Sequence, residues 1–583
     1  MLDSSRHNLK ITVMKFFLVF AIIAILIAAI IAVLVPYEPR NPLSGKEWPP
    51  GSPWPLPYNM SSTATVLSFN PATFRIVPLV LNSEQCDPLD FAVSKYNNDF
   101  LFATIEGIPG VPDPEVGLIS ELRVLVVGDA SGNTECQNFP RFSDDIDVYE
   151  RYAITISSDG LADIQAFTVW GALKGIETFA QLIWNNDNFD GNGPLHFYVN
   201  ETIVQDYPRF PHRGLMIDTS RHYQQEKIFY EVMDGMMYNK LNVFHWHIVD
   251  DQSFPYVSIR FPELSAKGAY TSRHVYTQEM IARVMEAGRL RGIRIVMEFD
   301  TPGHANSWGH AYPDLLTPCY GDGVTPDTPN YPQHAARENL NPMEEFTYSF
   351  MRDFFEEIVQ DVSKDIFVHL GMDEVYPPCW ESSPEIAEFM RINNYTSIPE
   401  VQEHFTTRHI AMVQQLGALP IIWQDPLDFG VNVDQDVLIQ VWKNWGPDWE
   451  SNLQNVLDKG YKTLLSAPWY INYIDYGESW RNYYEADPVL SLPNITEAQI
   501  PLIRGGEACL WGEFVDQTNI LPRLFPFISA VSERLWSHDI PISSQATNDA
   551  RRRLDHQRCR LLQRGIPSQP ILNGYCGAWE VLL

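Results

Sequence analysis

The stretch Asp365-Ile-Phe-Val-His-Leu-Gly-Met-Asp-Glu-Val375 joins a strand pattern to two adjacent carboxylates. Its first half is apolar and rich in residues that favour β structure, which predicts a buried strand ending at Asp373 and Glu374. Two like charges side by side repel, so the pKa of one of them should rise. A site obtains one carboxylic acid and one carboxylate near neutral pH in this way. An isolated Asp-Glu pair is more often a solvated strand end than a catalytic pair. The residues elsewhere in the chain are therefore needed to distinguish the two interpretations.

Short apolar runs recur after Asp206, each ending in polar or aromatic residues and most leading into a helical pattern. Eight strands alternating with helices are typical of a (β/α)8 TIM barrel, whose active site lies at the carboxyl ends of the strands. We therefore predict an α/β protein with this barrel over residues 206–583, including a C-terminal helical segment at 548–564 after a last barrel helix at 524–536. The predicted strands are 214–218, 242–250, 293–300, 366–374, 420–425, 437–442, 462–466 and 503–511.

A smaller α+β domain is predicted in front of the barrel, over residues 61–205. Alternating runs at 122–127 and 152–157 indicate strands, and 168–184 indicates a helix. This part of the sequence contains no concentrated set of chemical residues. We expect the active site to lie in the barrel alone.

The N-terminus has the pattern of a membrane anchor. Residues 16–35 form an unbroken apolar run of 20 residues, enough to cross a bilayer core of roughly 30 Å. Basic residues precede the run, so residues 1–15 should stay cytosolic and the rest of the chain should be lumenal or extracellular. The run is long for a cleaved signal peptide, which remains the alternative and would give a lysosomal or secreted protein. Residues 36–60 are rich in proline and predict an extended linker.

The charge of the chain limits its partners. Among 583 residues there are 41 Lys and Arg against 73 Asp and Glu, a net charge of −32. Nucleic acids and anionic lipids prefer a basic surface, so neither is expected as a ligand. Hydrophobic residues make up 45% of the chain, enough for the cores of two or three domains.

Cysteines and glycosylation signals favour the secretory pathway. The seven cysteines show no C-x-x-C spacing of a zinc site. Four Asn-x-Ser/Thr signals are present, and together with the N-terminus they indicate a compartment in which disulfides persist. The signals are at Asn59, Asn200, Asn394 and Asn494.

The predicted strand ends gather many carboxylates and aromatic rings with one arginine, Arg221. Aromatic rings can stack on the C–H faces of a pyranose, and carboxylates and arginine can bind its hydroxyls, so a sugar is the expected ligand. Phosphate chemistry would need more cations and a glycine-rich cradle. His245 and His247 with Asp250 could resemble metal ligands, but the H-E-x-x-H spacing is absent and we interpret them as structural, with no metal or other cofactor expected. Cys509 lies in an apolar strand and is expected to be inert.

Five ordered blocks resemble the β-N-acetylhexosaminidases of glycoside hydrolase family 20, the lysosomal hexosaminidase type. The resemblance runs from about residue 60 to the C-terminus and leaves out the N-terminal apolar segment. The blocks are Asp218-Thr-Ser-Arg-His222, Asn242-Val-Phe-His-Trp-His-Ile-Val-Asp-Asp-Gln-Ser-Phe-Pro255, Glu298-Phe-Asp-Thr-Pro-Gly-His304, His369-Leu-Gly-Met-Asp-Glu-Val375 and Gly505-Gly-Glu-Ala-Cys-Leu-Trp-Gly-Glu513.

The resemblance implies removal of terminal β-linked GlcNAc or GalNAc with retention of configuration, by a substrate-assisted mechanism. The 2-acetamido oxygen of the sugar attacks C1 and forms an oxazolinium ion, which water then opens. Asp373 is expected to orient the acetamide, and Glu374 to act as general acid and then as general base. In this scheme ionised Asp373 helps to keep Glu374 protonated.

The resemblance also implies roles for the remaining site residues. Arg221 should bind the 3- and 4-hydroxyls and Glu513 the 4- and 6-hydroxyl side, while Tyr470 should donate to the acetamido oxygen. Asp250 and His304 belong to the network around the acid and the acetamide. The tryptophans expected to form the pocket walls, with core packing as the alternative for each, are Trp423, Trp442 and Trp511. The implied disulfides are Cys86–Cys136, Cys319–Cys379 and Cys559–Cys576, with Cys509 free.

Two positions depart from the family pattern. The usual Gly-Gly-Asp-Glu is Gly371-Met372-Asp-Glu here, which removes the backbone freedom of a second glycine. Asn472 resembles the lysosomal subunit that tolerates a charged 6-substituent, but Tyr473 supplies no positive charge, so poor activity on 6-sulfated sugars is predicted. Family members are often dimers, so a homodimer is an expectation from the resemblance alone, and the residues show no interface signal. The competing hypotheses are a catalytically idle, membrane-anchored glycan-binding protein on the same scaffold and a relative that releases disaccharides.

Overall fold

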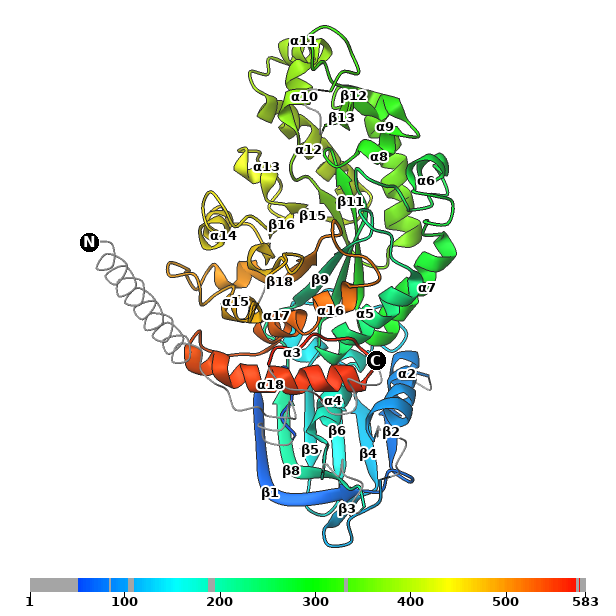
Figure 1. The fold of residues 1–583 in the computed structure, drawn as a ribbon, viewed down its shortest axis with the longest axis vertical. Helices are drawn as coiled ribbons and strands as arrows, with labels where there is room; N and C mark the ends of the chain where they lie inside the picture. Colours follow the sequence, from blue (N-terminus) through cyan, green and yellow to red (C-terminus); the bar gives the residue numbers. More distant parts are fainter. Residues whose placement is uncertain are drawn as a thin grey trace, which may run out of the picture.

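The computed structural model of the chain describes residues 51–82, 85–102, 110–186, 194–329, 334–475, 477–572 and 576. Figure 1 shows two parts stacked along the long axis of the molecule: an open sheet of N-terminal strands, and a barrel built from the rest of the chain. The expected membrane segment at 16–35 lies outside the described residues. Among the residues that are described, no helix has the length and apolar character needed to cross a bilayer.

Eight parallel strands close the barrel in chain order, and β18 pairs with β9 to complete it. Each strand coincides with one of the eight runs predicted from sequence, so the barrel prediction is confirmed. Most strand residues are buried because a parallel sheet closed into a barrel is covered on both faces. The strands are β9 (His212–Asp218), β10 (Val243–Val249), β11 (Arg294–Thr301), β14 (Phe367–Gly371), β15 (Leu419–Trp423), β16 (Leu438–Val441), β17 (Thr463–Leu465) and β18 (Ile503–Leu510).

The helices around the barrel are uneven in length. Those after β15 and β17 are only α13 (Asp425–Asp428) and α15 (Trp480–Glu485), while the connection from β14 to β15 holds three helices. The helix predicted at 524–536 is divided into α16 (Ile520–Leu524) and α17 (Phe527–Trp536) because Pro526, at the boundary, cannot donate a backbone hydrogen bond. The other barrel helices are α5 (Glu226–Tyr238), α6 (Glu263–Gly268), α7 (Gln278–Arg291), α8 (Asn306–Gly309), α9 (Glu345–Glu356), α10 (Pro377–Ser382), α11 (Pro384–Asn393), α12 (Ile398–Gln415) and α14 (Trp449–Asp458).

Short elements complete this part of the chain. A two-stranded ribbon, β12 (Leu316–Pro318) with β13 (Arg337–Leu340), projects between β11 and α9. The helical turns are η3 (Pro313–Leu315), η4 (Glu357–Val362), η5 (Ala467–Trp469) and η6 (Ile500–Leu502).

The N-terminal strands form an eight-stranded sheet in the order β2-β4-β6-β5-β8-β1-β3, with β7 also paired to β8. Helix α4 (Val169–Leu182) packs on this sheet and begins at Thr168, whose side chain caps the N–H of Gly171. The sheet strands are β1 (Asn59–Phe69), β2 (Arg75–Val80), β3 (Gly117–Ile119), β4 (Glu121–Val126), β5 (Tyr152–Ile156), β6 (Ala162–Ala166), β7 (Trp184–Asn185) and β8 (Phe197–Asp206). The other helical elements here are α2 (Asp87–Lys95), η1 (Tyr96–Phe100) and α3 (Ile146–Tyr149).

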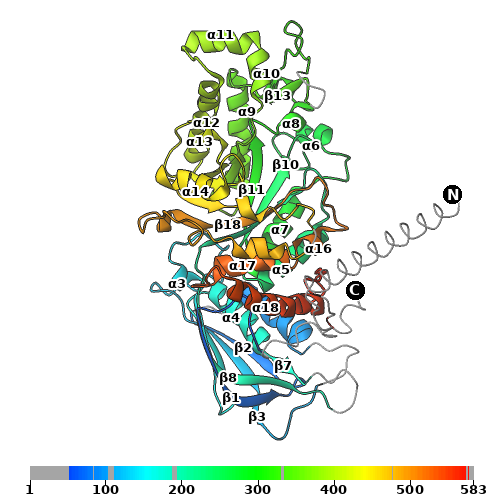
Figure 2. The ribbon, with the colours of Figure 1, turned by 60° about the vertical axis from the view of Figure 1, so that its left-hand side comes forward.

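The long C-terminal helix α18 (Ser544–Gln563) runs between the sheet and the barrel in both views (Figures 1 and 2). Arg560 donates to the Gln181 side chain on α4 at 3.1 Å, and Arg553 pairs with Glu533 on α17. Trp54 fills the same junction: it is fully buried and its Nε1 donates to the carbonyl of Ser529 at 3.0 Å. The end of the expected linker therefore differs from a free spacer, because it is packed and β1 already begins at Asn59.

Three disulfides join Cys86 to Cys136, Cys319 to Cys379 and Cys559 to Cys576, the pairs implied by the family resemblance. The second joins the chain beyond β11 to the chain beyond β14. The remaining cysteine, Cys509, is buried in β18 and unpaired with another cysteine. Asn59, Asn394 and Asn494 are exposed, whereas the side chain of Asn200 is half-buried and donates to the carbonyl of Thr63 at 2.9 Å.

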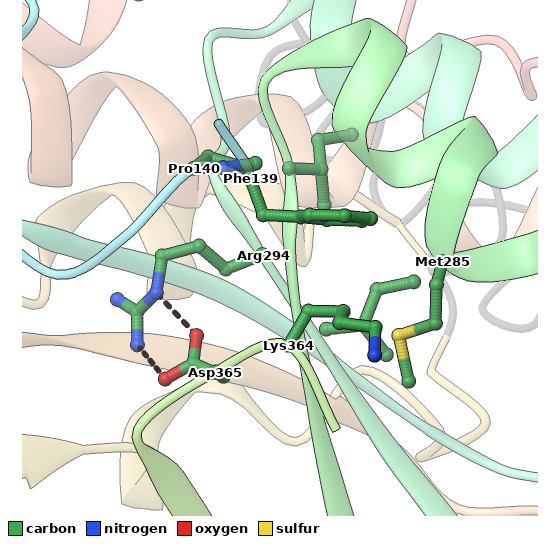
Figure 3. A pocket seen from close by; sticks show the side chains of 8 residues that line it. Phe139, Pro140, Met285, Arg294, Lys364 and Asp365 are labelled. Carbon is green, nitrogen blue, oxygen red and sulfur yellow. Dashed lines mark hydrogen bonds and ion pairs between the residues drawn. The ribbon is translucent and has the colours of Figure 1, made fainter. Parts of the chain in front are cut away.

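A small cavity lies at the amino ends of β11 and β14, between the barrel and the N-terminal part (Figure 3). Arg294 and Asp365 form an ion pair across it, with Nε and Oδ2 2.6 Å apart. Active sites in this fold lie at the opposite, carboxyl end of the strands, so this cavity is structural.

Candidate active site

The chain turns sharply where β14 ends, and this turn aims Asp373 and Glu374. Gly371, Met372 and Glu374 all have left-handed backbones, with φ of 69°, 79° and 47°. A Cβ at Gly371 would lie 1.7 Å from Oδ1 of Asp300, so only glycine fits there. Met372 occupies a conformation that costs a side-chain-bearing residue about 1 to 2 kcal/mol, and its N–H donates to Asp300 Oδ1 at 3.1 Å. Strained backbone of this kind clusters at functional sites.

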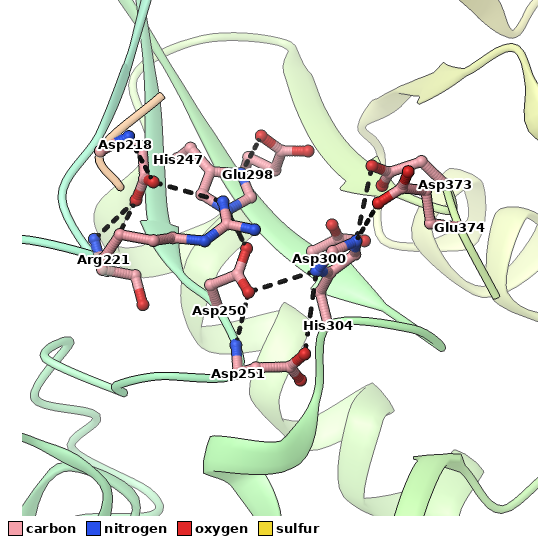
Figure 4. Close-up of polar contacts among 12 residues, drawn as sticks. Asp218, Arg221, His247, Asp250, Asp251, Glu298, Asp300, His304, Asp373 and Glu374 are labelled. Carbon is pink, nitrogen blue, oxygen red and sulfur yellow. Dashed lines mark hydrogen bonds and ion pairs between the residues drawn. The ribbon is translucent and has the colours of Figure 1, made fainter. Parts of the chain in front are cut away.

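His304 lies between the two acids and the rest of the site (Figure 4). Its Nε2 is 3.4 Å from Glu374 Oε2 and 3.7 Å from Asp373 Oδ2. On its other side, Nδ1 is 3.2 Å from Asp250 Oδ1. Burial opposes the charged form, but the charges of Asp250 and Asp373 and the hydrogen bonds to Asp250 and Glu374 hold the pKa of His304 well above its usual value. His304 is therefore a cation that faces both carboxyl groups.

The two acids differ from each other in the sense opposite to that expected. Burial raises the pKa of Asp373 to about 6, with the charge of His304 opposing the shift. The hydrogen bond from His304 lowers the pKa of Glu374, whose side chain is 56% exposed, so partial burial does not compensate. These opposite shifts contradict the expectation that ionised Asp373 keeps Glu374 protonated. Repulsion between neighbours is overridden by the histidine and by unequal burial.

A third carboxyl group, Asp300, lies next to Asp373. It comes from the end of β11 and is fully buried. Burial and the charge of Asp373 raise the pKa of Asp300 well above its usual value, and a hydrogen bond joins the two side chains. The same hydrogen bond lowers the pKa of Asp373. Asp300 is therefore the neutral acid that donates to the Asp373 carboxylate.

Asp250, at the end of β10, organises the other half of the polar site. Its Oδ2 is 2.8 Å from both Arg221 Nη1 and His247 Nε2. Burial would raise its pKa, but Arg221, His304 and His247 hold the pKa of Asp250 well below the usual range. Arg221 also pairs with Asp218 at 3.2 Å and its guanidinium lies over the Trp511 ring at 4.9 Å. The arginine is thus held rigidly, with a fixed set of donors.

Four aromatic side chains form one wall at the carboxyl end of the barrel. Tyr470 stacks near Trp442 with ring centres 6.2 Å apart and an interplanar angle of 21°. Trp423 and Trp511 lie 6.1 Å apart, and Trp511 is 6.4 Å from Tyr470. The expected wall residues are therefore in one cluster. Trp423 is fully buried and its Nε1 donates to Glu298 at 2.8 Å, so it also belongs to the polar interior.

Asp425 and Lys443 lie beside Glu374, and the sequence did not assign either a role. Asp425 Oδ1 accepts the N–H of Glu374 at 3.3 Å, and Oδ2 accepts Nε1 of Trp442 at 2.7 Å. Lys443 Nζ is 3.0 Å from Asp425 Oδ1. The available signal was position alone: Asp425 is the last residue of one predicted strand, 420–425, and Lys443 directly follows another, 437–442.

The residues expected at the 4- and 6-hydroxyl side lie at the rim. Glu513 is exposed, and its charge contributes to raising the pKa of Arg221. Asn472 is half-buried and Tyr473 is 61% exposed, beside Tyr470 at 6.1 Å.

Histidine and carboxylate groups that could hold a cation cluster at several points of the described residues. Atoms of His245, Glu298 and His369 lie within 4.8 Å of one another, as do those of Asp300, His304 and Asp373. Their nitrogens and oxygens pair with one another, for example His369 Nδ1 with Glu298 Oε1 at 2.9 Å. Several of these contacts are thus ion pairs between an imidazole and a carboxylate.

An eight-stranded barrel that presents a buried aspartate, an exposed glutamate, a clamped arginine and a tryptophan-rich wall at the carboxyl ends of its strands has the architecture of a barrel glycoside hydrolase. The comparisons with known proteins agree. The catalytic domain of glycosyl hydrolase family 20 matches residues 210–539, and the family "beta-acetyl hexosaminidase like" matches residues 53–182.

Curated relatives span nearly the whole chain. The chain is 41% identical to the beta-hexosaminidase subunit beta of Felis catus, covering 90% of this chain and 93% of the relative. It is 42% identical to the beta-hexosaminidase subunit alpha of Bos taurus, covering 90% and 94%. A solved chitobiase of Flavobacterium johnsoniae has a TM-score of 0.71 at 25% identity, covering 88% of this chain and 73% of that one. The chain belongs to glycosyl hydrolase family 20.

Proposed function

We propose that this chain is an exo-β-N-acetylhexosaminidase that removes terminal β-linked GlcNAc or GalNAc from glycans by a retaining, substrate-assisted mechanism. The observation that carries the assignment is the unequal placement of the two acids: Asp373 is buried and Glu374 is open to solvent, with cationic His304 between them. The alpha and beta hexosaminidase subunits resemble the chain equally well, so similarity does not single out one subunit type.

In this proposal Asp373 binds the acetamide N–H of the substrate. Burial raises the pKa of Asp373 to about 6, while the charge of His304 and the hydrogen bond from Asp300 oppose that rise. Above this pKa Asp373 is ionised, and an ionised carboxylate can accept the amide proton and polarise the amide oxygen toward C1. Tyr470, which is buried beside Trp442, donates to the same oxygen. The sugar amide thereby becomes the nucleophile, and the bond from C1 to the leaving oxygen breaks as the new C1–O bond forms.

Glu374 gives its proton to the leaving oxygen in the first step and takes one from water in the second. The hydrogen bond from His304 lowers its pKa, and its side chain is largely open to solvent. A bound sugar excludes that solvent, and desolvation raises the pKa of a carboxyl group. We therefore assign the protonation of Glu374 to substrate binding rather than to repulsion from Asp373.

The remaining residues hold the sugar. Arg221, fixed by Asp250 and Asp218, presents donors to the 3- and 4-hydroxyls. Glu513 accepts from the 4- and 6-hydroxyl side, and Asn472 lies nearby at the rim. Trp442 and Trp511 stack against the ring. Trp423, held in place by its hydrogen bond to Glu298, forms the floor of the sugar site.

Hydrolysis of aryl β-GlcNAc and β-GalNAc glycosides, with and without a thiazoline that mimics the oxazoline, tests the proposal. Turnover that the thiazoline blocks supports it. The alternative, an idle glycan-binding protein on the same scaffold, predicts binding without turnover. Glu374→Gln separates the two, because the enzyme loses turnover while the fold stays intact.

We also propose that the chain enters the secretory pathway, with domain boundaries near residues 60 and 205 and with residues 16–35 as an uncleaved anchor. The three disulfides and the exposed Asn59, Asn394 and Asn494 support a lumenal or extracellular location. Carbonate extraction of membranes tests the anchor, and enzymatic deglycosylation tests the sites. Sedimentation of the purified protein tests whether it forms a homodimer.

A further inference from the structure

The interior of the barrel beneath the catalytic acids contains a buried carboxylate that the proposed mechanism does not use. Glu298 is on β11 and is fully buried. Its Oε1 is 2.9 Å from His369 Nδ1 and accepts Trp423 Nε1 at 2.8 Å. Its Oε2 is 3.0 Å from His245 Nε2 and 2.5 Å from His247 Nδ1. One carboxylate therefore faces four ring nitrogens from three other strands.

One of these contacts leads directly to the active site (Figure 4). His247 uses Nδ1 toward Glu298 and Nε2 toward Asp250, at 2.5 and 2.8 Å. Asp250 in turn meets Arg221 at 2.8 Å and His304 at 3.2 Å. Every link is within ion-pair distance, and each imidazole uses both of its nitrogens.

We propose, resting on the proposed function, that Glu298 is a positioning residue: by pairing with His247 it keeps Asp250 in the orientation that clamps Arg221 and His304 for catalysis. Burial alone would neutralise a histidine. Instead the charges of Glu298 and Asp250 raise the pKa of His247 to about 10, against the effect of burial. His247 thus remains a double donor over the working range of the enzyme.

Charged groups and one aromatic ring from the described residues face His247. They are Glu298 and Asp300 from β11, Asp250 at the end of its own strand, and the edge of the Trp511 ring from the chain after β18. Without the Glu298 charge, Asp250 alone would oppose burial. The pKa of His247 would then fall toward the neutral range, and the imidazole would lose its proton as the pH rises.

Glu298→Gln tests the idea because the amide keeps the shape and removes the charge. We expect the alkaline limb of kcat/KM to move down by at least one pH unit, with a loss of about 10- to 100-fold above the new ionisation, the size of a charged hydrogen bond. Glu298→Asp, which keeps the charge, should restore the limb. A loss of equal size at every pH would overturn the proposal, since a packing role alone would cause it.

Glu507→Gln is the matched control. Glu507 on β18 is equally buried and also faces two histidines, His212 at 3.4 Å and His245 at 3.3 Å. Within the described part of the chain, however, no ion pair or hydrogen bond joins Glu507 to His247 or Asp250. This variant should lower the melting temperature and leave the alkaline limb in place. An equal shift of the limb in both variants would overturn the proposal.

If Glu298→Gln does not fold, His247→Gln carries the test from the other end of the same contact. It should raise KM and lower kcat/KM, because Asp250 loses a charged donor. Wild-type kinetics for His247→Gln would overturn the proposal. Absence of turnover in the wild-type chain would instead refute the proposed function, so the two failures are distinguishable.

Discussion

Asp300 offers the sharpest test of how the catalytic pair is set. Its raised pKa makes it a neutral donor to Asp373, while its Oδ1 accepts the N–H of Met372 at 3.1 Å. Asn at this position can do both, because its amide nitrogen donates and its oxygen accepts. We therefore expect Asp300→Asn to keep kcat/KM for an aryl β-GlcNAc glycoside within about threefold of wild type, a difference of less than about 1 kcal/mol.

Asp300→Ala removes the donor and leaves the buried Asp373 carboxylate without it. A hydrogen bond to a charged group contributes about 1.5 to 3 kcal/mol, so kcat/KM should fall about 10- to 150-fold. The melting temperature of each variant separates this effect from unfolding. If Asn and Ala cause the same loss, the proton on Asp300 is not what matters, and the reasoning fails.

The pH profile adds an independent check with a definite sign. A carboxyl group with a raised pKa is neutral below that pKa and ionises above it. Wild-type Asp300 must therefore ionise when the pH becomes high enough, placing a second negative charge beside Asp373. Asp300→Asn has no such step, so its profile should extend further on the alkaline side. A narrower alkaline limb in Asp300→Asn would contradict the assignment.

Four further predictions follow from other contacts. Glu374→Gln should lower kcat by about 10²- to 10⁴-fold on substrates with poor leaving groups and by less on activated aryl glycosides, which need less protonation; an equal loss on both would argue against an acid role. Gly371→Ala should cost at least about 3 kcal/mol because its Cβ meets Asp300, whereas Gly323→Ala, with φ of 77° but no atom within 4 Å, should cost about 1 kcal/mol in a denaturation series. Replacing Cys319 and Cys379 by serine should cost up to about 4 kcal/mol, since the disulfide closes a loop with a sequence separation of 60, and unchanged unfolding would exclude that role. A 6-sulfated substrate should react poorly because Tyr473 offers no positive charge, and a rate equal to that of the unsulfated sugar would refute this.

The barrel could be predicted from the sequence because its strands are short apolar runs with polar ends. Strand β18 is an example: residues 503–511 were predicted and Ile503–Leu510 is observed. The ends of helices were harder to predict, as the break at Pro526 between α16 and α17 shows. The packed end of the proline-rich segment was not foreseeable, because the partner of Trp54 lies at Ser529 on a helix 475 residues away. Long-range burial of this kind leaves no local signal.

The charge states of Asp373 and Glu374 also depend on long-range contacts that the local sequence does not reveal. Sequence placed Asp373 and Glu374 together and indicated that one pKa should rise, but neighbouring residues on a chain share neither exposure nor partners. The turn at Gly371 and Met372 sends one side chain inward to Asp300 and the other outward to solvent, and His304 arrives from a different strand. Which acid is protonated is therefore decided by two segments far apart in sequence: the turn after β14, and the end of β11 with the loop that carries His304. Because substrate binding must then desolvate Glu374, protonation of Glu374 should be coupled to sugar binding. The affinity of an uncharged GlcNAc analogue should therefore increase as the pH falls through the pKa that Glu374 has in the complex. The Glu374→Gln variant should show no such pH dependence.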